Sequence, residues 1–206
     1  MTGSVLWIRH GTSLDGILRP TAHARPDTPL TLRGAIQIAA TARDLRDRGI
    51  RPIMVMTSPH PRARASAAIL ADLLGTPLAR PDPLYAEWRA PDCVLGKGPD
   101  DYPTEYQAWR AARRRDPDSA LPGGESLTAF RRRAAAASLA HEQATDGGTT
   151  LIVSHRLLIG AVAAISAGIS HAGDVFQAAR AFPLCPAKVW FLPPVTQRAE
   201  PPRSKQ

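Results

Sequence analysis

The sequence predicts an α/β fold: a three-layer α/β/α sandwich with a mostly parallel central sheet and a small cap segment. Three short apolar runs, at residues 5–8, 53–56 and 149–153, indicate buried strands. Stretches with helical periodicity lie between these runs. Because strands that alternate with helices usually pair in parallel and are covered on both faces, this order favours a layered α/β domain.

Helices are expected where apolar side chains recur every three or four residues. The first expected helix covers residues 32–48, with Thr31 as its candidate cap and Gly49 as its end. Its apolar face is expected to contain Leu32, Ala35, Ile36, Ala39 and Leu45. The other expected elements are helices over 61–74, about 102–115, about 126–145 and 156 to about 167, and a last strand over 188–192.

The 206-residue length suits one sizeable domain. We expect a single domain over residues 1–192, in which residues 88–120 form the cap segment, followed by a disordered Pro-rich tail over 193–206. No apolar run approaches the roughly 20 residues of a membrane helix, and the N-terminus reads as a strand rather than a signal peptide. The two cysteines suggest neither a disulfide framework nor a metal cluster. A cytoplasmic protein without a membrane partner is therefore expected, and its oligomeric state stays open.

The formal net charge is +8, and much of it comes from arginine clusters at 113–115 and 131–133. Such charge suits either an acidic partner or a phosphorylated substrate. The clusters fall within helical patterns and lack the interleaved aromatic residues of nucleic-acid platforms. We therefore expect them to form a solvated surface, and we expect no nucleic-acid partner.

Polar residues of one chemical kind follow each of the three apolar runs. Arg9 and His10 follow the first, Ser58 follows the second with Arg62 soon after, and His155 follows the third. Ligands of open α/β sheets bind outside the carboxyl ends of the strands, so these side chains are expected to converge. Arginine forks and imidazoles suit a dianionic phosphate. The sequence thus predicts a site for a small phosphorylated substrate.

Four segments carry a family resemblance. They read Ile-Arg-His-Gly-Thr at 8–12, Thr-Ser-Pro-His-Pro-Arg-Ala at 57–63, Gly-Glu-Ser at 124–126 and Val-Ser-His at 153–155. In this order they resemble the signature of the histidine phosphatase superfamily, which includes phosphoglycerate mutases and many small-molecule phosphatases. The resemblance spans about residues 5–165. Arg-His-Gly alone is a weak signal, whereas four motifs in the correct order and strand context are specific.

The resemblance implies a role for each matching position. His10 would be the nucleophile that takes the phosphoryl group, and Glu87 would be the proton donor to the leaving oxygen. The phosphate-binding side chains would be Arg9, Ser13, Arg62 and His155, with His155 also counted as catalytic. The rival carboxylate, Glu125, precedes a helix and is read as mainly structural. The resemblance implies no metal and no cofactor.

Two departures from the family pattern concern the substrate more than the chemistry. Gly16 stands where many relatives carry an Asn, and Arg156 stands where many have Gly after the second histidine. Arg156 is therefore a candidate specificity residue that either contacts a second anionic group or points into solvent. Trp88 and Tyr102, in the expected cap, either stack on the substrate or pack the cap onto the domain.

Three functions are compatible with these residues. The first is a metal-independent phosphomonoesterase that hydrolyses a small phosphorylated metabolite through a phosphohistidine intermediate. The second is a phosphoglycerate-type phosphomutase, although only 38 positions separate Glu87 from Glu125, which leaves little chain to cage a substrate for retransfer. The third is a non-catalytic interaction protein with the same fold, against which the complete residue set argues.

Overall fold

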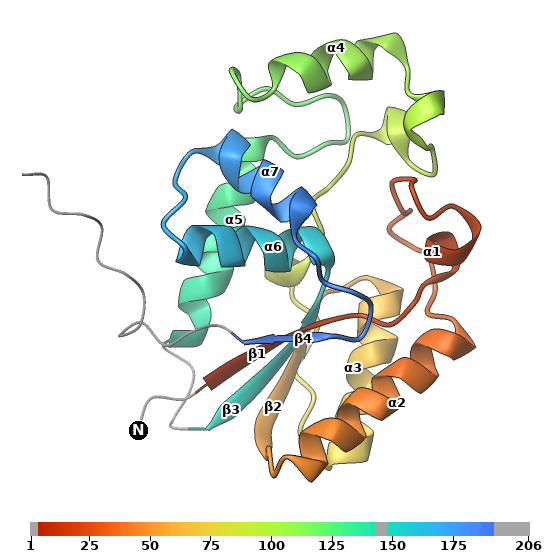
Figure 1. The fold of residues 1–206 in the computed structure, drawn as a ribbon, viewed down its shortest axis with the longest axis vertical. Helices are drawn as coiled ribbons and strands as arrows, with labels where there is room; N and C mark the ends of the chain where they lie inside the picture. The colour runs from red at the N-terminus through yellow and green to blue at the C-terminus, as the bar shows by residue number, and fades with distance from the viewer. Residues whose placement is uncertain (1–3, 143–147, 192–206) are drawn as a thin grey trace, which may run out of the picture.

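The computed structural model describes residues 4–142 and 148–191, with a four-stranded sheet at the centre (Figure 1). The strands, in the spatial order β2-β3-β1-β4, are β2 (Pro52–Thr57), β3 (Thr149–Ser154), β1 (Ser4–Arg9) and β4 (Val189–Phe191). The first three are parallel, and β4 pairs antiparallel with β1. The predicted layered α/β fold with a mostly parallel sheet is therefore confirmed.

Both faces of β1 and β3 are buried, as their continuous apolar runs predicted. The expected burial of the run at 53–56 is wrong in part, because β2 is an edge strand in which Ile53 is exposed and Met54 and Met56 are half-buried. Successive side chains of a strand point to opposite faces, so β1 contributes to two cores. Leu6 and Ile8 belong to the core under one pair of helices, whereas Val5 and Trp7 belong to the core under the other helices. Trp7 and Ile8 have no exposed surface.

Helices cover the sheet on both sides (Figure 1). On one face lie α2 (Leu32–Asp47) and α3 (Pro61–Leu74), and on the other lie α5 (Leu127–Glu142), α6 (Arg156–Ser166) and α7 (Ala172–Ala181). Helix α7 was not expected from the sequence. The expected helix over 126–145 corresponds to α5, and its residues 143–145 lie outside the described part of the chain.

The buried face of α2 differs from the predicted one. Leu32 and Ile36, expected on the core face, are exposed, while Gly34, Ile38 and Ala42 are buried together with Leu45. The reason is a close backbone approach. A Cβ on Gly34 would lie 2.3 Å from the carbonyl oxygen of Thr12, so the helix turns this side toward the β1 end. The predicted cap at Thr31 is present, because its Oγ1 accepts a hydrogen bond from Gly34 N.

A smaller layer lies beyond the carboxyl ends of the strands, where α1 and α4 are drawn apart from the sheet (Figure 1). Its elements are α1 (Leu14–Leu18), α4 (Thr104–Ala112) and three 3-10 turns, η1 (Pro83–Tyr85), η2 (Asp92–Val94) and η3 (Pro99–Asp101). The short α1 falls in a Pro-rich stretch for which no helix was expected. The domain and cap boundaries stay predictions, and the tail over 193–206 lies outside the described residues. No helix of the described residues is long and apolar enough to cross a membrane.

Candidate active site

The ends of β1 and β3 bring two histidines together. Arg9 of β1 is in register with Ser154 of β3, and the next residues are His10 and His155. His10 N donates a hydrogen bond to Ser154 O at 3.0 Å, which continues the ladder by one residue. The two imidazole centroids are consequently 5.0 Å apart. The predicted convergence of the strand ends on one place is observed.

Hydrogen bonding fixes the tautomer of His10. Its Nδ1 lies 2.7 Å from the carbonyl oxygen of Gly11, which can only accept, so Nδ1 carries the proton. The Nε2 atom of the neutral ring therefore carries a lone pair and no proton. Arg62 donates from Nε to this atom at 3.2 Å, in agreement with that assignment. The side chain of His10 thus presents an unprotonated nitrogen beside a guanidinium.

His10 is neutral in this environment. Burial is the main cause that lowers its pKa well below the usual range, and the charges of Arg62 and Arg9 lower the pKa further. The hydrogen bond to Gly11 acts in the opposite direction and is outweighed. A histidine held neutral above its depressed pKa keeps its Nε2 lone pair available.

Arg62 is buried in the first turn of α3 and is fixed from two sides. Besides its bond to His10, its Nη1 donates to the carbonyl oxygens of Arg25 and Pro26, at 3.1 and 3.2 Å. Within the described residues, no carboxylate lies within 4.0 Å of Arg62 or of Arg9. Arg9 donates from Nη1 to the carbonyl oxygen of Leu184 at 2.6 Å. Both guanidinium groups thus lie beside the histidines without an ion pair, and Glu87 is the carboxylate whose charge acts on both.

His155 is completely buried and belongs to a second small network. Its Nε2 lies 2.8 Å from Ser58 Oγ, and this oxygen also accepts from His60 N at 3.2 Å. The ring of His60 is 4.8 Å from that of His155. His60 was part of the second motif but was not singled out from the sequence. Burial, followed by Arg62, lowers its pKa to about 4, so it is neutral at pH 7.

Glu87 lies against the start of α6. Its carboxylate accepts hydrogen bonds from the backbone N atoms of Leu157 and Leu158, at 3.3 and 3.2 Å, and from Trp88 N at 3.0 Å. Two N–H groups of the α6 N-terminus therefore bind a carboxylate, which the positive end of a helix dipole favours.

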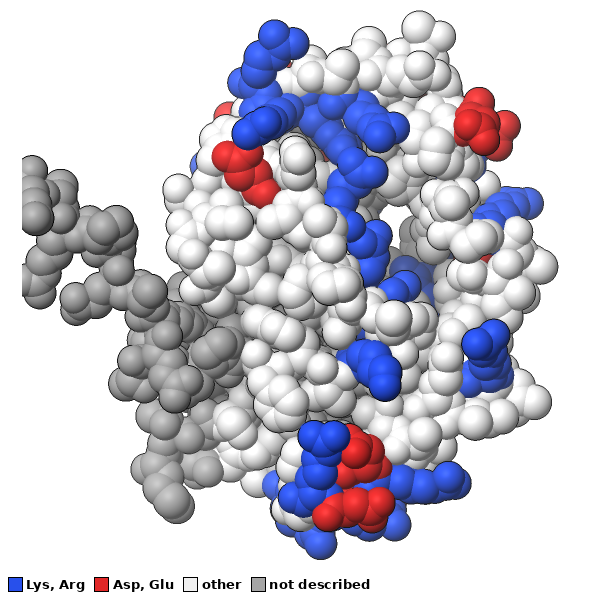
Figure 2. All heavy atoms as spheres, in the orientation of Figure 1, with Lys and Arg blue, Asp and Glu red and all other residues white. Residues whose placement is uncertain are grey.

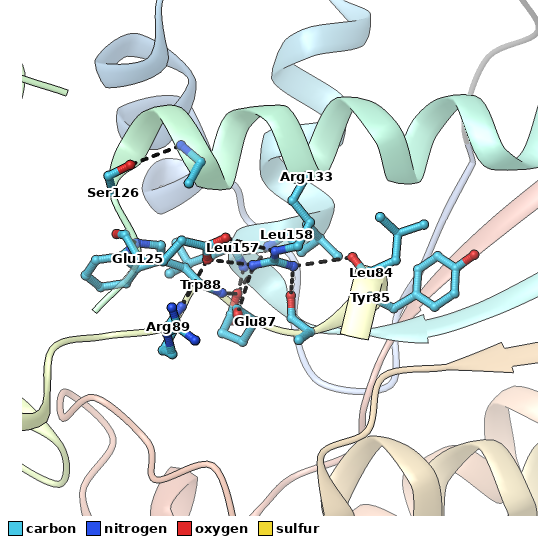
Figure 3. Close-up of polar contacts among 12 residues, drawn as sticks. Leu84, Tyr85, Glu87, Trp88, Arg89, Glu125, Ser126, Arg133, Leu157 and Leu158 are labelled. Carbon is cyan, nitrogen blue, oxygen red and sulfur yellow. Dashed lines mark hydrogen bonds and ion pairs between the residues drawn. The ribbon is translucent and has the colours of Figure 1, made fainter. Parts of the chain in front are cut away.

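The loop that carries Glu87 is held by an ion pair (Figure 3). Arg133 projects from α5, and its Nε and Nη2 donate to Glu125 at 2.9 and 2.7 Å. The same guanidinium donates to the carbonyl oxygens of Leu84, Ala86 and Glu87. Glu125 therefore has the structural setting that the sequence suggested. The expectation that the arginines of 131–133 form a solvated surface is wrong for Arg133, because its role depends on contacts across the fold.

A cavity of about 900 Å³ opens from the histidines toward the smaller layer. The predicted site residues that line it are Arg9, His10, Ser13, Arg62, Glu87, Trp88, Tyr102 and Arg156. His155 lies behind His10 and is not among the lining residues. Ser13, the residue before α1, is buried, and its side chain makes no cap hydrogen bond.

The predicted specificity residues have different environments. Trp88 is buried, its Nε1 donates to the carbonyl oxygen of Glu125 at 2.8 Å, and its ring stacks on Trp109. Tyr102 is half-buried, with its ring 5.7 Å from that of His23. Arg156 donates from Nη1 to the carbonyl oxygen of Arg180 at 2.5 Å, next to the end of α7. A cation suits this helix end, which compensates for the position of Arg156 at the start of α6.

The backbone behind His10 is closely packed. A Cβ on Gly11 would lie 2.3 Å from the carbonyl oxygen of Gly34 in α2. Such a distance leaves no room for any side chain at position 11 without a backbone shift. Gly11 also donates from its N to Ser66 Oγ of α3 at 3.2 Å. The strand end that carries His10 is therefore anchored to both helices on this face.

No group of three or more His, Cys, Asp or Glu side chains that could hold a metal ion occurs in residues 4–142 and 148–191. The charges nearest the histidines are instead the guanidinium groups of Arg9 and Arg62.

Comparison with known proteins agrees with this geometry. Residues 5–178 match the model of the histidine phosphatase superfamily, branch 1. The chain belongs to the histidine phosphatase superfamily, which confirms the family predicted from the four motifs.

Individual relatives point in the same direction. The chain is 32% identical over 167 residues to a protein of Yersinia pestis (strain Pestoides F) named probable phosphoglycerate mutase GpmB, covering 80% of this chain and 75% of the relative. It is similar to the crystal structure of the α-ribazole phosphatase of Shigella flexneri, with a TM-score of 0.68, 25% identity and 84% of each chain covered. A mycobacterial glucosyl-3-phosphoglycerate phosphatase in complex with VO3 shares the fold, with a TM-score of 0.71, 24% identity and coverage of 93% and 91%.

Proposed function

We propose that this protein is a phosphomonoesterase that hydrolyses a small phosphorylated metabolite through a phosphohistidine formed on Nε2 of His10. The observation that carries the proposal is the tautomer of His10. The Gly11 carbonyl holds the proton on Nδ1, the lone pair of Nε2 accepts a hydrogen bond from Arg62, and both residues line the cavity. A buried, neutral imidazole with a fixed orientation is a pre-organised nucleophile.

The surrounding charges suit the transfer of a phosphoryl group. As Nε2 forms its bond to phosphorus, the P–O bond to the leaving group breaks, and negative charge spreads over the three equatorial oxygens. Arg9 and Arg62 would stabilise this charge, since no described carboxylate forms an ion pair with either of them. Arg62 would then exchange its hydrogen bond with His10 for one with the phosphoryl oxygens. His155 and Ser13 would complete the phosphate pocket.

Proton transfer is assigned to Glu87. Protonated, it would donate to the leaving oxygen as the P–O bond breaks, and as a carboxylate it would accept the proton of the water that attacks phosphorus. That attack forms a new P–O bond, breaks the P–N bond and returns His10 to its starting state. The backbone N–H groups of Leu157 and Leu158 hold the carboxylate at the cavity wall, which fixes its direction.

The test is trapping of the intermediate. Brief incubation with a 32P-labelled aryl phosphate, followed by denaturation, should leave an acid-labile and alkali-stable label on the wild-type protein. His10→Ala should take no label and should lose more than 99% of the hydrolysis rate, with an unchanged circular dichroism spectrum as the control for folding. A folded His10→Ala protein that keeps more than a few per cent of the wild-type rate contradicts the proposal.

A phosphomutase is the second candidate, because the Yersinia relative is named a probable phosphoglycerate mutase. The two reactions differ in where the phosphoryl group of the intermediate goes. A phosphatase delivers it to water, so inorganic phosphate accumulates without a bisphosphate primer. A mutase returns it to a second hydroxyl and conserves the ester. Measuring phosphate release against isomer formation with 2- and 3-phosphoglycerate separates them.

A further inference from the structure

The far end of the cavity carries a second group of arginines. Arg110 comes from α4, Arg113 follows α4, and Arg180 comes from the last turn of α7, and all three line the cavity. Figure 2 shows basic side chains in a row that descends from the region of α4 and α7 into the hollow at the centre of this face. These arginines are separate in origin from Arg9 and Arg62 at the strand ends. We call Arg110, Arg113 and Arg180 the distal arginines.

Arg113 is unusual because its charge is buried. The residue is 7% exposed, and its Nη1 has no hydrogen-bond partner among the described residues. The guanidinium lies between two aromatic rings, 5.1 Å from the centroid of Trp109 and 4.6 Å from that of Phe176. Tyr106 also interacts with it, but a phenol is neutral at pH 7 and supplies no negative charge. A buried donor without a partner is costly, which favours a ligand that completes it.

The cavity as a whole has an excess of positive charge. Nine arginines and four carboxylates line it, and within the described residues no carboxylate lies within 4.0 Å of Arg110, Arg113 or Arg180. Arg133 and Glu125 neutralise each other. One phosphate dianion beside Arg9 and Arg62 would leave the distal charges without a counterion.

The distal arginines surround one imidazole. His23 lies against the rings of Tyr102 and Tyr106, and its Nε2 is 3.1 Å from the hydroxyl of Tyr106. Burial, followed by the charges of Arg113, Arg180 and Arg110, lowers the pKa of His23 to about 4. His23 therefore stays neutral at pH 7 and adds no charge to the distal end. The positive potential there comes from the guanidinium groups, which can each offer forked donors.

We propose that the substrate carries a second anionic group, a carboxylate or a phosphate, and that Arg110, Arg113 and Arg180 bind this group. The inference rests on the proposed function for the position of the scissile phosphate at His10. It adds the class of substrate: a phosphate ester with two anionic ends, long enough to reach from the strand ends to α4 and α7. Arg156, bonded to the carbonyl of Arg180, lies between the two ends.

Binding of phosphonates tests this without requiring hydrolysis. Calorimetry compares alkylphosphonates with ω-carboxyalkylphosphonates of the same chain length, over a series of lengths. At the best length, the carboxylate should tighten binding at least tenfold, which equals about 1.4 kcal/mol. A parallel series of α,ω-bisphosphonates distinguishes a distal phosphate from a distal carboxylate, according to which terminal group gives the larger gain. Equal affinities of the one-anion and two-anion compounds at every length would overturn the proposal.

Substitutions of the distal arginines test whether they provide the gain in affinity from the second anionic group. Arg110→Gln and Arg180→Gln change exposed residues, and each should remove most of this gain. Arg113→Met should have the same effect if the variant folds. Arg115→Gln is the matched control, because Arg115 is exposed, close in sequence and does not line the cavity. Arg115→Gln should keep the gain. An equal loss in the control and in the distal variants would mean a general charge effect, and the distal site would be wrong.

The two proposals fail in different ways. If the protein binds the two-anion phosphonates as expected but releases no phosphate from any ester, the phosphatase proposal is wrong and the distal site remains. If the protein hydrolyses aryl phosphates through His10 but a second anion does not increase affinity, the distal site is wrong and the phosphatase proposal remains.

Discussion

The carboxylate of Glu125 accepts hydrogen bonds from both Nε and Nη2 of Arg133, at 2.9 and 2.7 Å. This pair fixes a guanidinium that also bonds the carbonyl oxygens of Ala86 and Glu87. Both carboxylates line the cavity, but Glu125 acts on the loop through Arg133, whereas the carboxylate of Glu87 is bound by the backbone N–H groups of Leu157 and Leu158. The two carboxylates should therefore respond differently to the same substitution.

Glu87→Gln should lower kcat for phenyl phosphate by about 10²- to 10⁴-fold, the usual contribution of a general acid. The dissociation constant of vanadate should change much less, because the proton is needed only in the transition state. The loss should shrink with 2,4-dinitrophenyl phosphate, whose leaving group hardly needs protonation. Steady-state kinetics with both esters and a vanadate titration provide the measurement.

Glu125→Gln is the matched comparison, since it also removes one carboxylate charge. It should lower the free energy of unfolding by about 1–3 kcal/mol by weakening the bonds to Arg133. Its effect on kcat should be similar for the two esters. If Glu125→Gln showed the leaving-group dependence and Glu87→Gln did not, the proton donor would have been assigned to the wrong carboxylate.

Activity should survive removal of divalent ions. Arg9 and Arg62 supply the positive charge that a metal would bring to the phosphate, and no described cluster offers three metal ligands. Dialysis against EDTA, followed by an aryl phosphate assay in metal-free buffer, should leave the rate within about twofold. Loss of activity on dialysis that returns with Mg²⁺, Mn²⁺ or Zn²⁺ would contradict this expectation.

Stability should decrease below pH 6.5. Burial is the main cause that lowers the pKa of four histidines in the folded protein, to about 4 for His23 and His60. Between about pH 6.5 and 4 the unfolded chain binds protons that the folded protein does not, so the free energy of unfolding falls as the pH falls. Each such histidine contributes a slope of at most about 1.4 kcal/mol per pH unit.

Urea denaturation at pH 7, 6 and 5 measures this slope. His23→Gln keeps a side chain that can bond the Tyr106 hydroxyl but cannot take up a proton, so its slope should be shallower than that of the wild type. His171→Gln, at an exposed position, is the control. Identical slopes in the wild type and His23→Gln would show that His23 takes up no proton on unfolding in this range.

Arg156→Gly should reduce the preference for the true substrate over a plain aryl phosphate. Because Arg156 lines the cavity, its loss should raise KM for the true substrate about tenfold, or about 1.4 kcal/mol. The ratio of kcat/KM for the two substrates is the relevant measurement. Arg156→Lys, which keeps the charge, should lie in between. An unchanged ratio in both variants would limit Arg156 to its bond with the Arg180 carbonyl.

The sequence predicted those elements whose signals are local. Continuous apolar runs predicted β1, β2 and β3, and the flanking Thr31 and Gly49 marked the start and the end of α2. The direction of β4 was not predictable, because three apolar residues do not encode pairing with β1. Helix α7 was missed although the sequence carries a signal for it, because Ala172, Val175, Phe176 and Ala179 recur every three or four residues and form its buried face.

The candidate site was predictable at the strand ends and much less so around the cavity. His10, Arg62 and His155 lie in motifs next to strands, so their convergence follows from a parallel sheet. The expected solvated surface at 113–115 is wrong for Arg113, which is buried between aromatic rings. An arginine-rich segment carries no local signal of such burial, since the rings belong to different helices.

The contact between Gly11 and Gly34 makes these two positions interdependent. A methyl group on Gly11 would meet the backbone of Gly34, and one on Gly34 would meet the backbone of Thr12, so a replacement at either position has to be accommodated by displacing the residues around His10 or the first turn of α2. Random mutagenesis with selection for phosphate release should therefore rarely recover substitutions at positions 11 and 34, although Gly34 does not line the cavity. The intolerance of α2 at this point would reflect the shape of its backbone, and the exposed Leu32 and Ile36 on the same helix would vary freely.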